Sequence, residues 1–202
     1  MIDQFKLPVD VDDNDKVLAA CEGLNTALQH LIPLARKLHL LSFNGACSAA
    51  RAGINGDVFR VLTRDIQYLS NEVTVCIEET QFKMKNIMML ASRVVSILPS
   101  PSLLDQRCTT MDKTTFIHFS DQKNDQLAPL FYQLSLTFFQ LSTAVRKGEY
   151  LAVFASVEAA NSDEPHLSFE IVASTLKSII ADLKLQSKIQ KNLLDDLVEF
   201  VI

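Results

Sequence analysis

The cysteines and histidines are the residues of this chain most able to do chemistry, and their spacing limits what that chemistry could be. The cysteines, at 21, 47, 76 and 108, stand about thirty residues apart, and no CxxC or paired cysteine–histidine spacing occurs. Protein zinc sites usually draw their ligands from such clusters. We therefore expect no metal and no cofactor, and we expect the cysteines to be small buried hydrophobic residues in a reducing compartment.

His30 offers an alternative chemistry. It stands three residues before Pro33 in LQHLIPLARK, a placement similar to the phosphoacceptor box of histidine kinases. The residue that follows it is Leu31 rather than an acid, and His30 lies between apolar positions of a helical pattern. No GxSxG motif, glycine-rich phosphate loop or HExxH motif occurs. The sequence therefore predicts that the chain is not an enzyme, and a phosphotransfer protein that uses His30 is kept as an alternative.

The composition indicates which elements hold these residues. The chain has 202 residues, of which 48% are hydrophobic and 21% charged, so it can bury a core. Five glycines and six prolines are too few for the many turns of an all-β domain. A net charge of −5 argues against nucleic acid as a partner. We see no signal peptide and no apolar run that could span a bilayer, so we expect a cytoplasmic protein without membrane insertion.

Apolar spacing predicts four helices of nearly equal length. They cover about 14–53, 57–97, 125–162 and 165–202, and in each the apolar residues recur at alternating steps of three and four. The sequence thus predicts an all-α fold, a long antiparallel four-helix bundle that forms a single domain over 1–202. Its two tandem hairpins, 14–97 and 125–202, are joined by a loop over 98–124. We expect the short turns at 53–57 and 161–165 to lie at one end of the bundle, and the chain termini and the loop at the other.

Glycine and proline mark where the helices should end or bend. Gly53 can adopt the left-handed conformation that ends a helix, and Pro165 suits a first helical turn. Pro33 lies inside the first helix, where it removes a backbone hydrogen bond, so we expect a kink or break near Gln29–Ile32. Near the two turns the apolar seam consists of small residues, which allow helices to approach closely. These are Ser42, Gly45, Ala49, Ala52, Ala152, Ala155 and Ala159.

Residues 35–72, ARKLHLLSFNGACSAARAGINGDVFRVLTRDIQYLSNE, form a pattern more specific than a helical seam. This segment resembles the membrane-distal tip of methyl-accepting chemotaxis receptors. The matches in register are Leu40, Leu41, Asn44, Ala49, Ala50, Arg51, Ala52, Gly53, Gly56, Phe59 and Val61. The segment departs from the family at Ser48 and Ile54, where the family has glutamates, and at Asp57 and Val58, where it has arginine and glycine.

A weaker second copy of the same pattern covers 147–181. Glu158, Glu164 and Phe169 match the family there, whereas Phe154 and Asn161 depart from it. The two copies align with an offset of 110 residues, which pairs Leu41 with Leu151, Ala49 with Ala159, Ala50 with Ala160 and Phe59 with Phe169. An internal duplication would make this chain a pseudo-dimer of two fused receptor hairpins.

The resemblance implies a function in signalling. In the receptor family, paired hairpins form a four-helix bundle whose tips bind each other, a histidine kinase and its coupling adaptor. By this resemblance the partners would be chemoreceptor tips, the coupling adaptor or the histidine kinase, without a small-molecule ligand. The expected partner-binding residues are Asn44, Arg51, Ile54, Phe59, Glu158, Glu164 and Phe169. Phe59 and Phe169 could instead each bury a ring within its own hairpin, and the chain could instead be a helical scaffold or dimerisation module for unrelated partners.

Overall fold

The computed structural model describes residues 11–95, 111–161 and 167–201, and it describes side chains over 18–90, 128–161 and 168–196. Apart from turns at His30 and Ala52, the described backbone is helical and contains no strand. The helices are α1 (Val11–Gln29), α2 (Leu31–Arg51), the 3₁₀ helix η1 (Gly53–Gly56), α3 (Asp57–Val95), α4 (Met111–Asn161) and α5 (Leu167–Val201). The predicted all-α bundle is confirmed, with α1 and α2 together forming its first column.

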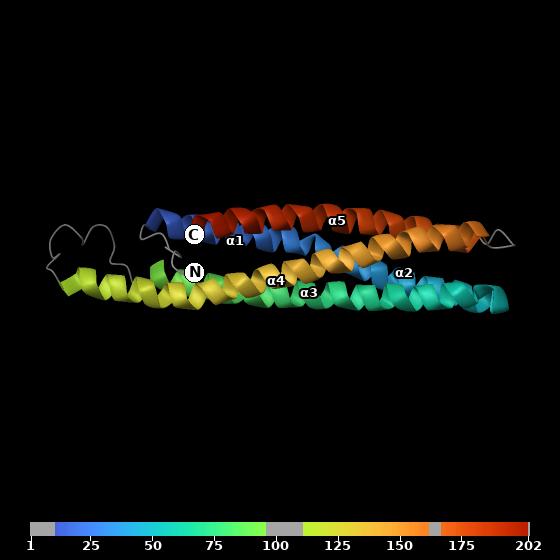
Figure 1. Cartoon of the computed structure of the whole chain (residues 1–202), viewed down its shortest axis with the longest axis horizontal. Helices are drawn as coiled ribbons and strands as arrows, with labels where there is room; N and C mark the ends of the chain where they lie inside the picture. The colour runs from blue at the N-terminus through green and yellow to red at the C-terminus, as the bar shows by residue number, and fades with distance from the viewer. Residues whose placement is uncertain (1–10, 96–110, 162–166, 202) are drawn as a thin grey trace.

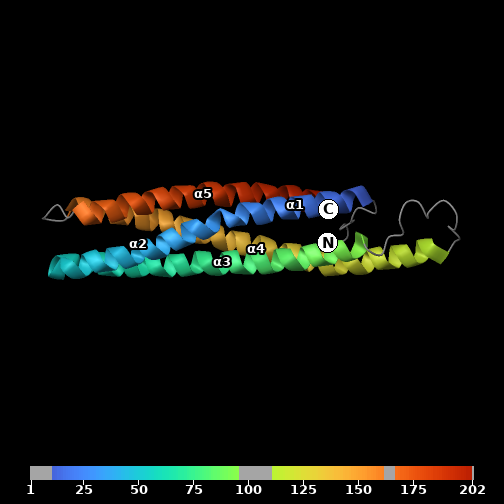
Figure 2. The same ribbon diagram turned by 180° about the vertical axis from the view of Figure 1, so that it is seen from behind.

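The columns run alternately up and down the bundle (Figures 1 and 2). The column of α1 and α2 packs against α3 and α5, and α4 packs against the same two helices from the other side. The end of α2, the start of α3, the end of α4 and the start of α5 all lie at one end, which we call the turn end. The start of α1 and the end of α5 lie toward the opposite end, as expected from the four-segment pattern.

The apolar seams form one continuous core along the bundle. Leu24, Leu31 and Leu38 of the first column and Ile66 of α3 are fully buried, and each buried side chain of this kind stabilises the fold by about 1.5–3 kcal/mol. Burial repeats at the offset of 110 residues seen in the sequence. Along the first column and α4, for example, 21, 24, 27, 28 and 31 are buried, as are 131, 134, 137, 138 and 141.

The break expected at Pro33 is confirmed. α1 ends at Gln29 and α2 begins at Leu31, so Pro33 lies in the first turn of α2, where its missing N–H has no helical partner to lose. The carbonyl oxygen of Ala27 accepts hydrogen bonds from His30 N at 3.2 Å and from Nε2 of the buried Gln190 of α5 at 3.1 Å. A side chain from a neighbouring helix therefore adds a second hydrogen bond to a carbonyl beside the break.

The loop predicted over 98–124 is wrong for 111–124, because α4 begins at Met111. Residues 98–110 lie outside the described part of the chain. Neither glycine nor proline occurs between Pro101 and Pro129, so no backbone preference stops the helix in this stretch. Pro129 itself lies inside α4 rather than at its start. Within the described residues, no helix is both long and apolar enough to cross a membrane.

Candidate functional site

Two glycines shape the turn end of the first hairpin. Ala52 N donates a hydrogen bond to Ser48 O at 3.1 Å, and Gly53 then adopts φ of +62°, a left-handed conformation that a side chain would strain. Gly56 is buried against the backbone of Ala49, so closely that a Cβ atom at position 56 would overlap the Ala49 carbonyl. The turn therefore requires glycine at both positions, as the resemblance to receptor tips implies.

Arg60 stabilises this turn through its guanidinium group, a role that was not predicted from the sequence. Its Nη2 donates a hydrogen bond to the carbonyl oxygen of Gly53 at 2.7 Å, and its Nη1 lies 2.9 Å from the Asp57 carboxylate. Asp57 is one of the positions at which the segment departs from the receptor pattern. The pairing of Asp57 with Arg60 three residues later on the same helix was the available sequence signal.

Phe59 and Phe169 join the two hairpins. Their rings stack with centroids 3.8 Å apart and an interplanar angle of 7°, and the side chains are 2% and 1% exposed. They therefore cannot offer their rings to a partner, and their assignment as partner-binding residues is wrong. Each ring also does more than hold its own hairpin, because its stacking neighbour comes from the other hairpin, on the far side of the bundle core.

The remaining candidate residues differ in accessibility. Asn44 and Arg51 of α2 are exposed, and the side chain of neither makes a hydrogen bond or ion pair with the described residues. Ile54 is 87% exposed at the turn itself. Glu158 of α4 is half-buried, and Glu164 lies outside the described residues. Three of the seven candidates thus form an exposed group on the first hairpin, and the structure does not place a complete acidic group beside them.

Exposed apolar residues occur on the same two helices, α2 and α3, near this turn. Phe43 is 66% exposed beside Asn44, and Val58 and Val61 are 43% and 54% exposed at the start of α3. Sequence reasoning missed Phe43 and passed over Val58 and Val61 as contacts, although all three lie outside the 3–4 seam of their helices. Exposed apolar side chains and arginine are residue types that are enriched in protein interfaces.

The cysteines and histidines of the described segments differ in exposure. Cys21 and Cys76 are buried free thiols, as expected, whereas Cys47 is exposed. Burial raises the pKa of Cys21 to about 12, and burial, with a smaller contribution from the charges of Glu79 and Glu72, raises the pKa of Cys76. His30 is exposed at the break between α1 and α2. Among the residues whose side chains are placed, no three His, Cys, Asp or Glu residues gather as metal ligands would.

Comparison of the chain with protein-family models, curated proteins and solved structures gives no match. The resemblance to chemoreceptor tips therefore rests on the residues of this chain alone.

Proposed function

We propose that this protein is a single-chain, chemoreceptor-like signalling bundle that binds a component of a chemotaxis array through its turn end. The observation that carries the proposal is the position of Arg51 and Ile54. Both belong to the segment that resembles a receptor tip, and both are exposed around a turn that requires two glycines. The partner would be a receptor tip, the coupling adaptor or the histidine kinase.

The chemistry of the group suggests how binding would occur. The Arg51 guanidinium would pair with a carboxylate of the partner, which fixes orientation as well as adding affinity. Ile54, at 87% exposure, would lose most of its contact with water, which makes it a candidate anchor. Preferential binding to one signalling state of the array would then shift the population of states.

The substitution Arg51→Glu tests this proposal. We expect it to weaken binding to a purified chemoreceptor cytoplasmic fragment or coupling adaptor by about tenfold or more, equivalent to about 1.4 kcal/mol. Calorimetric titration measures the affinity. Helical content and melting temperature should stay nearly unchanged, because substitution of an exposed residue usually costs within about 0.5 kcal/mol.

Lys188→Glu is the matched control, because it makes the same charge change at an exposed position in the C-terminal half of α5, away from the turn end where that helix starts. It should leave the affinity unchanged. Equal affinity of the parent and Arg51→Glu proteins, or absence of binding by the parent at high micromolar concentration, would favour the alternative of a helical scaffold for unrelated partners.

A further inference from the structure

A line of exposed apolar side chains runs along α3, outside the core. Its members recur at intervals of seven residues and are 46–66% exposed: Val61, Tyr68, Val75, Phe82 and Met89. Seven residues make almost two helical turns, so these side chains form one ridge along the helix. The core seam of α3 does not account for them, because it already has its own buried positions at Leu62, Ile66, Leu69 and Val73.

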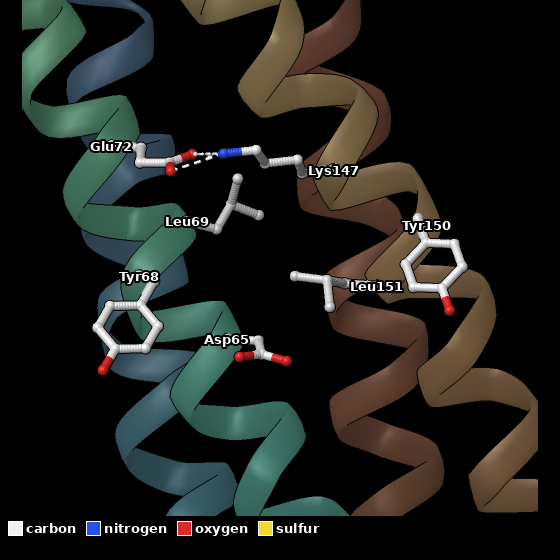
Figure 3. A pocket seen from close by; sticks show the side chains of 7 residues that line it. All are labelled: Asp65, Tyr68, Leu69, Glu72, Lys147, Tyr150 and Leu151. Carbon is white, nitrogen blue, oxygen red and sulfur yellow. Dashed lines mark hydrogen bonds and ion pairs between the residues drawn. The ribbon is translucent and has the colours of Figure 1, made fainter.

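A second, shorter ridge lies opposite on α4. Leu136, Tyr150 and Val157 are 45%, 70% and 48% exposed. The antiparallel register is set by the ion pair of Lys147 with Glu72 at 2.7 Å and by hydrogen bonds from Lys83 to Gln133 and Thr137. This register places Tyr68 and Tyr150 on opposite sides of a groove between the helices, as Figure 3 shows. We call this surface the α3–α4 face.

The groove contains one carboxylate that is not neutralised. It encloses about 340 Å³, with Leu69 and Leu151 between the two tyrosines. Glu72 is paired with Lys147, but the half-buried Asp65 makes no hydrogen bond or ion pair with the residues that the structure describes. The ring of Tyr150 is stacked on Phe154 one turn away, with centroids 6.4 Å apart. A negative charge thus lies between two aromatic side chains and above an apolar floor.

The equivalent face, between α5 and α2, keeps exposed apolar residues at Ile171, Leu185 and Leu40 but lacks the aromatic residues and the counterpart of Asp65. At the offset of 110 residues, Asp65 corresponds to Thr175, Tyr68 to Ser178, Phe82 to Asn192 and Tyr150 to Leu40. The core position beneath the groove is apolar in both halves of the bundle, since the buried Leu69 corresponds to the buried Ile179. Bundle geometry alone therefore does not require the aromatic and acidic residues of the α3–α4 face.

We propose that the α3–α4 face binds an amphipathic helix of a partner protein, whose apolar residues pack along the two ridges and whose arginine enters the groove to pair with Asp65. The seven-residue spacing of the α3 ridge suits a helical partner in particular, because a packed helix repeats its contacts at that interval. A guanidinium suits a carboxylate flanked by tyrosines, because it pairs with the former and stacks on the latter. This binding would be separate from that proposed for the turn end.

A second copy of this chain is a poorer occupant. In an isologous dimer the same face would have to supply the cation for Asp65. The lysines between α3 and α4 are engaged, Lys147 by Glu72 and Lys83 by Glu79 at 3.3 Å, which leaves Arg64 and Arg146 as the exposed arginines of these two helices near the groove. The chain as a whole is also acidic, with a net charge of −5, which favours a basic partner.

The test is selection of helical peptides displayed on phage, with randomised surface positions, against the complete chain. We expect the enriched peptides to share apolar residues at heptad spacing and one arginine. Affinity of a synthetic peptide carrying one tryptophan is then measured by its fluorescence, because the protein contains no tryptophan. Asp65→Asn and Val75→Ser should each weaken binding by about tenfold, and replacement of the peptide arginine by glutamine should abolish the effect of Asp65→Asn.

The duplicated bundle supplies matched controls. Leu185→Ser corresponds to Val75→Ser on the opposite face, and Thr175→Asn corresponds to Asp65→Asn; both should leave the affinity unchanged. The proposal is overturned if no peptide is enriched, if the enriched peptides lack a basic residue, or if Leu185→Ser weakens binding as much as Val75→Ser. It is also overturned if sedimentation shows a dimer of the protein that Val75→Ser dissociates.

Discussion

The first columns of the two hairpins differ in continuity although they share one pattern of burial. The column of α1 and α2 is interrupted at His30, before Pro33, whereas α4 continues through the equivalent position, Thr143. The core residues Leu31 and Leu141, at equivalent positions beside the interruption, are both buried. Packing against α3 and α5 therefore sets the register of both columns, and the backbone hydrogen bonds at this level are not required for it.

The two hairpins also distribute volume differently within the core. Leu38 of α2 is fully buried, and its counterpart in α4 is Gly148. A Cβ atom at Gly148 would overlap the side chain of Ile180 and touch that of Leu69, so these larger residues occupy the space beside the glycine. The core therefore repeats its pattern of burial more strictly than the identity of each residue.

The largest effect should come from the stacked phenylalanines, which hold equivalent positions in the two hairpins. Phe59→Ala and Phe169→Ala should each lower the free energy of unfolding by about 3–5 kcal/mol, because each leaves a cavity in the core. The double variant should lose less than the sum of both, since each single variant already destroys the stacking. Denaturant unfolding measures all three. Additive losses would contradict the coupling of the two rings, and a loss confined to one variant would contradict the equivalence of the hairpins at this layer.

The first column is interrupted before Pro33, whereas α4 is continuous through Thr143. Exchanging proline and threonine between these two equivalent positions tests this difference. Thr143→Pro should lower the free energy of unfolding by about 3 kcal/mol or more, because the proline removes the backbone hydrogen bond to Phe139 and its ring meets that carbonyl. Pro33→Thr should change it by less than about 1 kcal/mol, because position 33 lies in the first turn of α2, where the new N–H can add at most one backbone hydrogen bond, to Gln29. Similar losses in the two variants, by thermal or denaturant unfolding, would show that the columns respond alike to proline.

The smallest perturbation uses the cysteines, which among the described residues all belong to the first hairpin. In a Cys108→Ser background, we expect one thiol per native chain, Cys47, to react rapidly with a disulfide reagent at pH 8. Cys21 and Cys76 should react slowly, because both are buried and burial raises their pKa values, that of Cys21 to about 12. Rapid reaction of two or three thiols would show that the first hairpin opens readily.

The sequence allowed most of the fold to be predicted, because the seam and its breakers act locally. The heptad spacing identified the four columns, and Pro33 identified the break within one turn of its observed position. The start of α4 could not be placed from the sequence. Residues 111–124 have too weak an apolar pattern to predict a helix, and they contain no helix breaker that would mark where one begins. Thr115–Phe119, which has β-branched and aromatic residues, lies within α4 because α-helical propensity and neighbouring residues act together over a longer window.

The candidate sites were less predictable, because contacts between the hairpins depend on their relative placement. Arg51 and Ile54 were identified from the turn pattern and are exposed. Both turns were expected at one end of the bundle, but stacking of Phe59 on Phe169 also requires that α3 and α5 face each other across the core, which the pattern of a single helix does not reveal. The ridge from Val61 to Met89 had a sequence signal, the apolar residue at every seventh position, but the stronger seam of the same helix obscured it.

The break at His30 also has a mechanical consequence. A continuous α-helix behaves as a stiff rod, because its ladder of hydrogen bonds transmits rotation and axial displacement from turn to turn. α3, α4 and α5 cross the middle of the bundle as such rods, but the first column consists of two shorter rods joined at His30. His30 itself keeps helical backbone angles of −73° and −20°, so a twist applied to the start of α1 is shared between this joint and the side-chain contacts with α3 and α5, including that of Gln190.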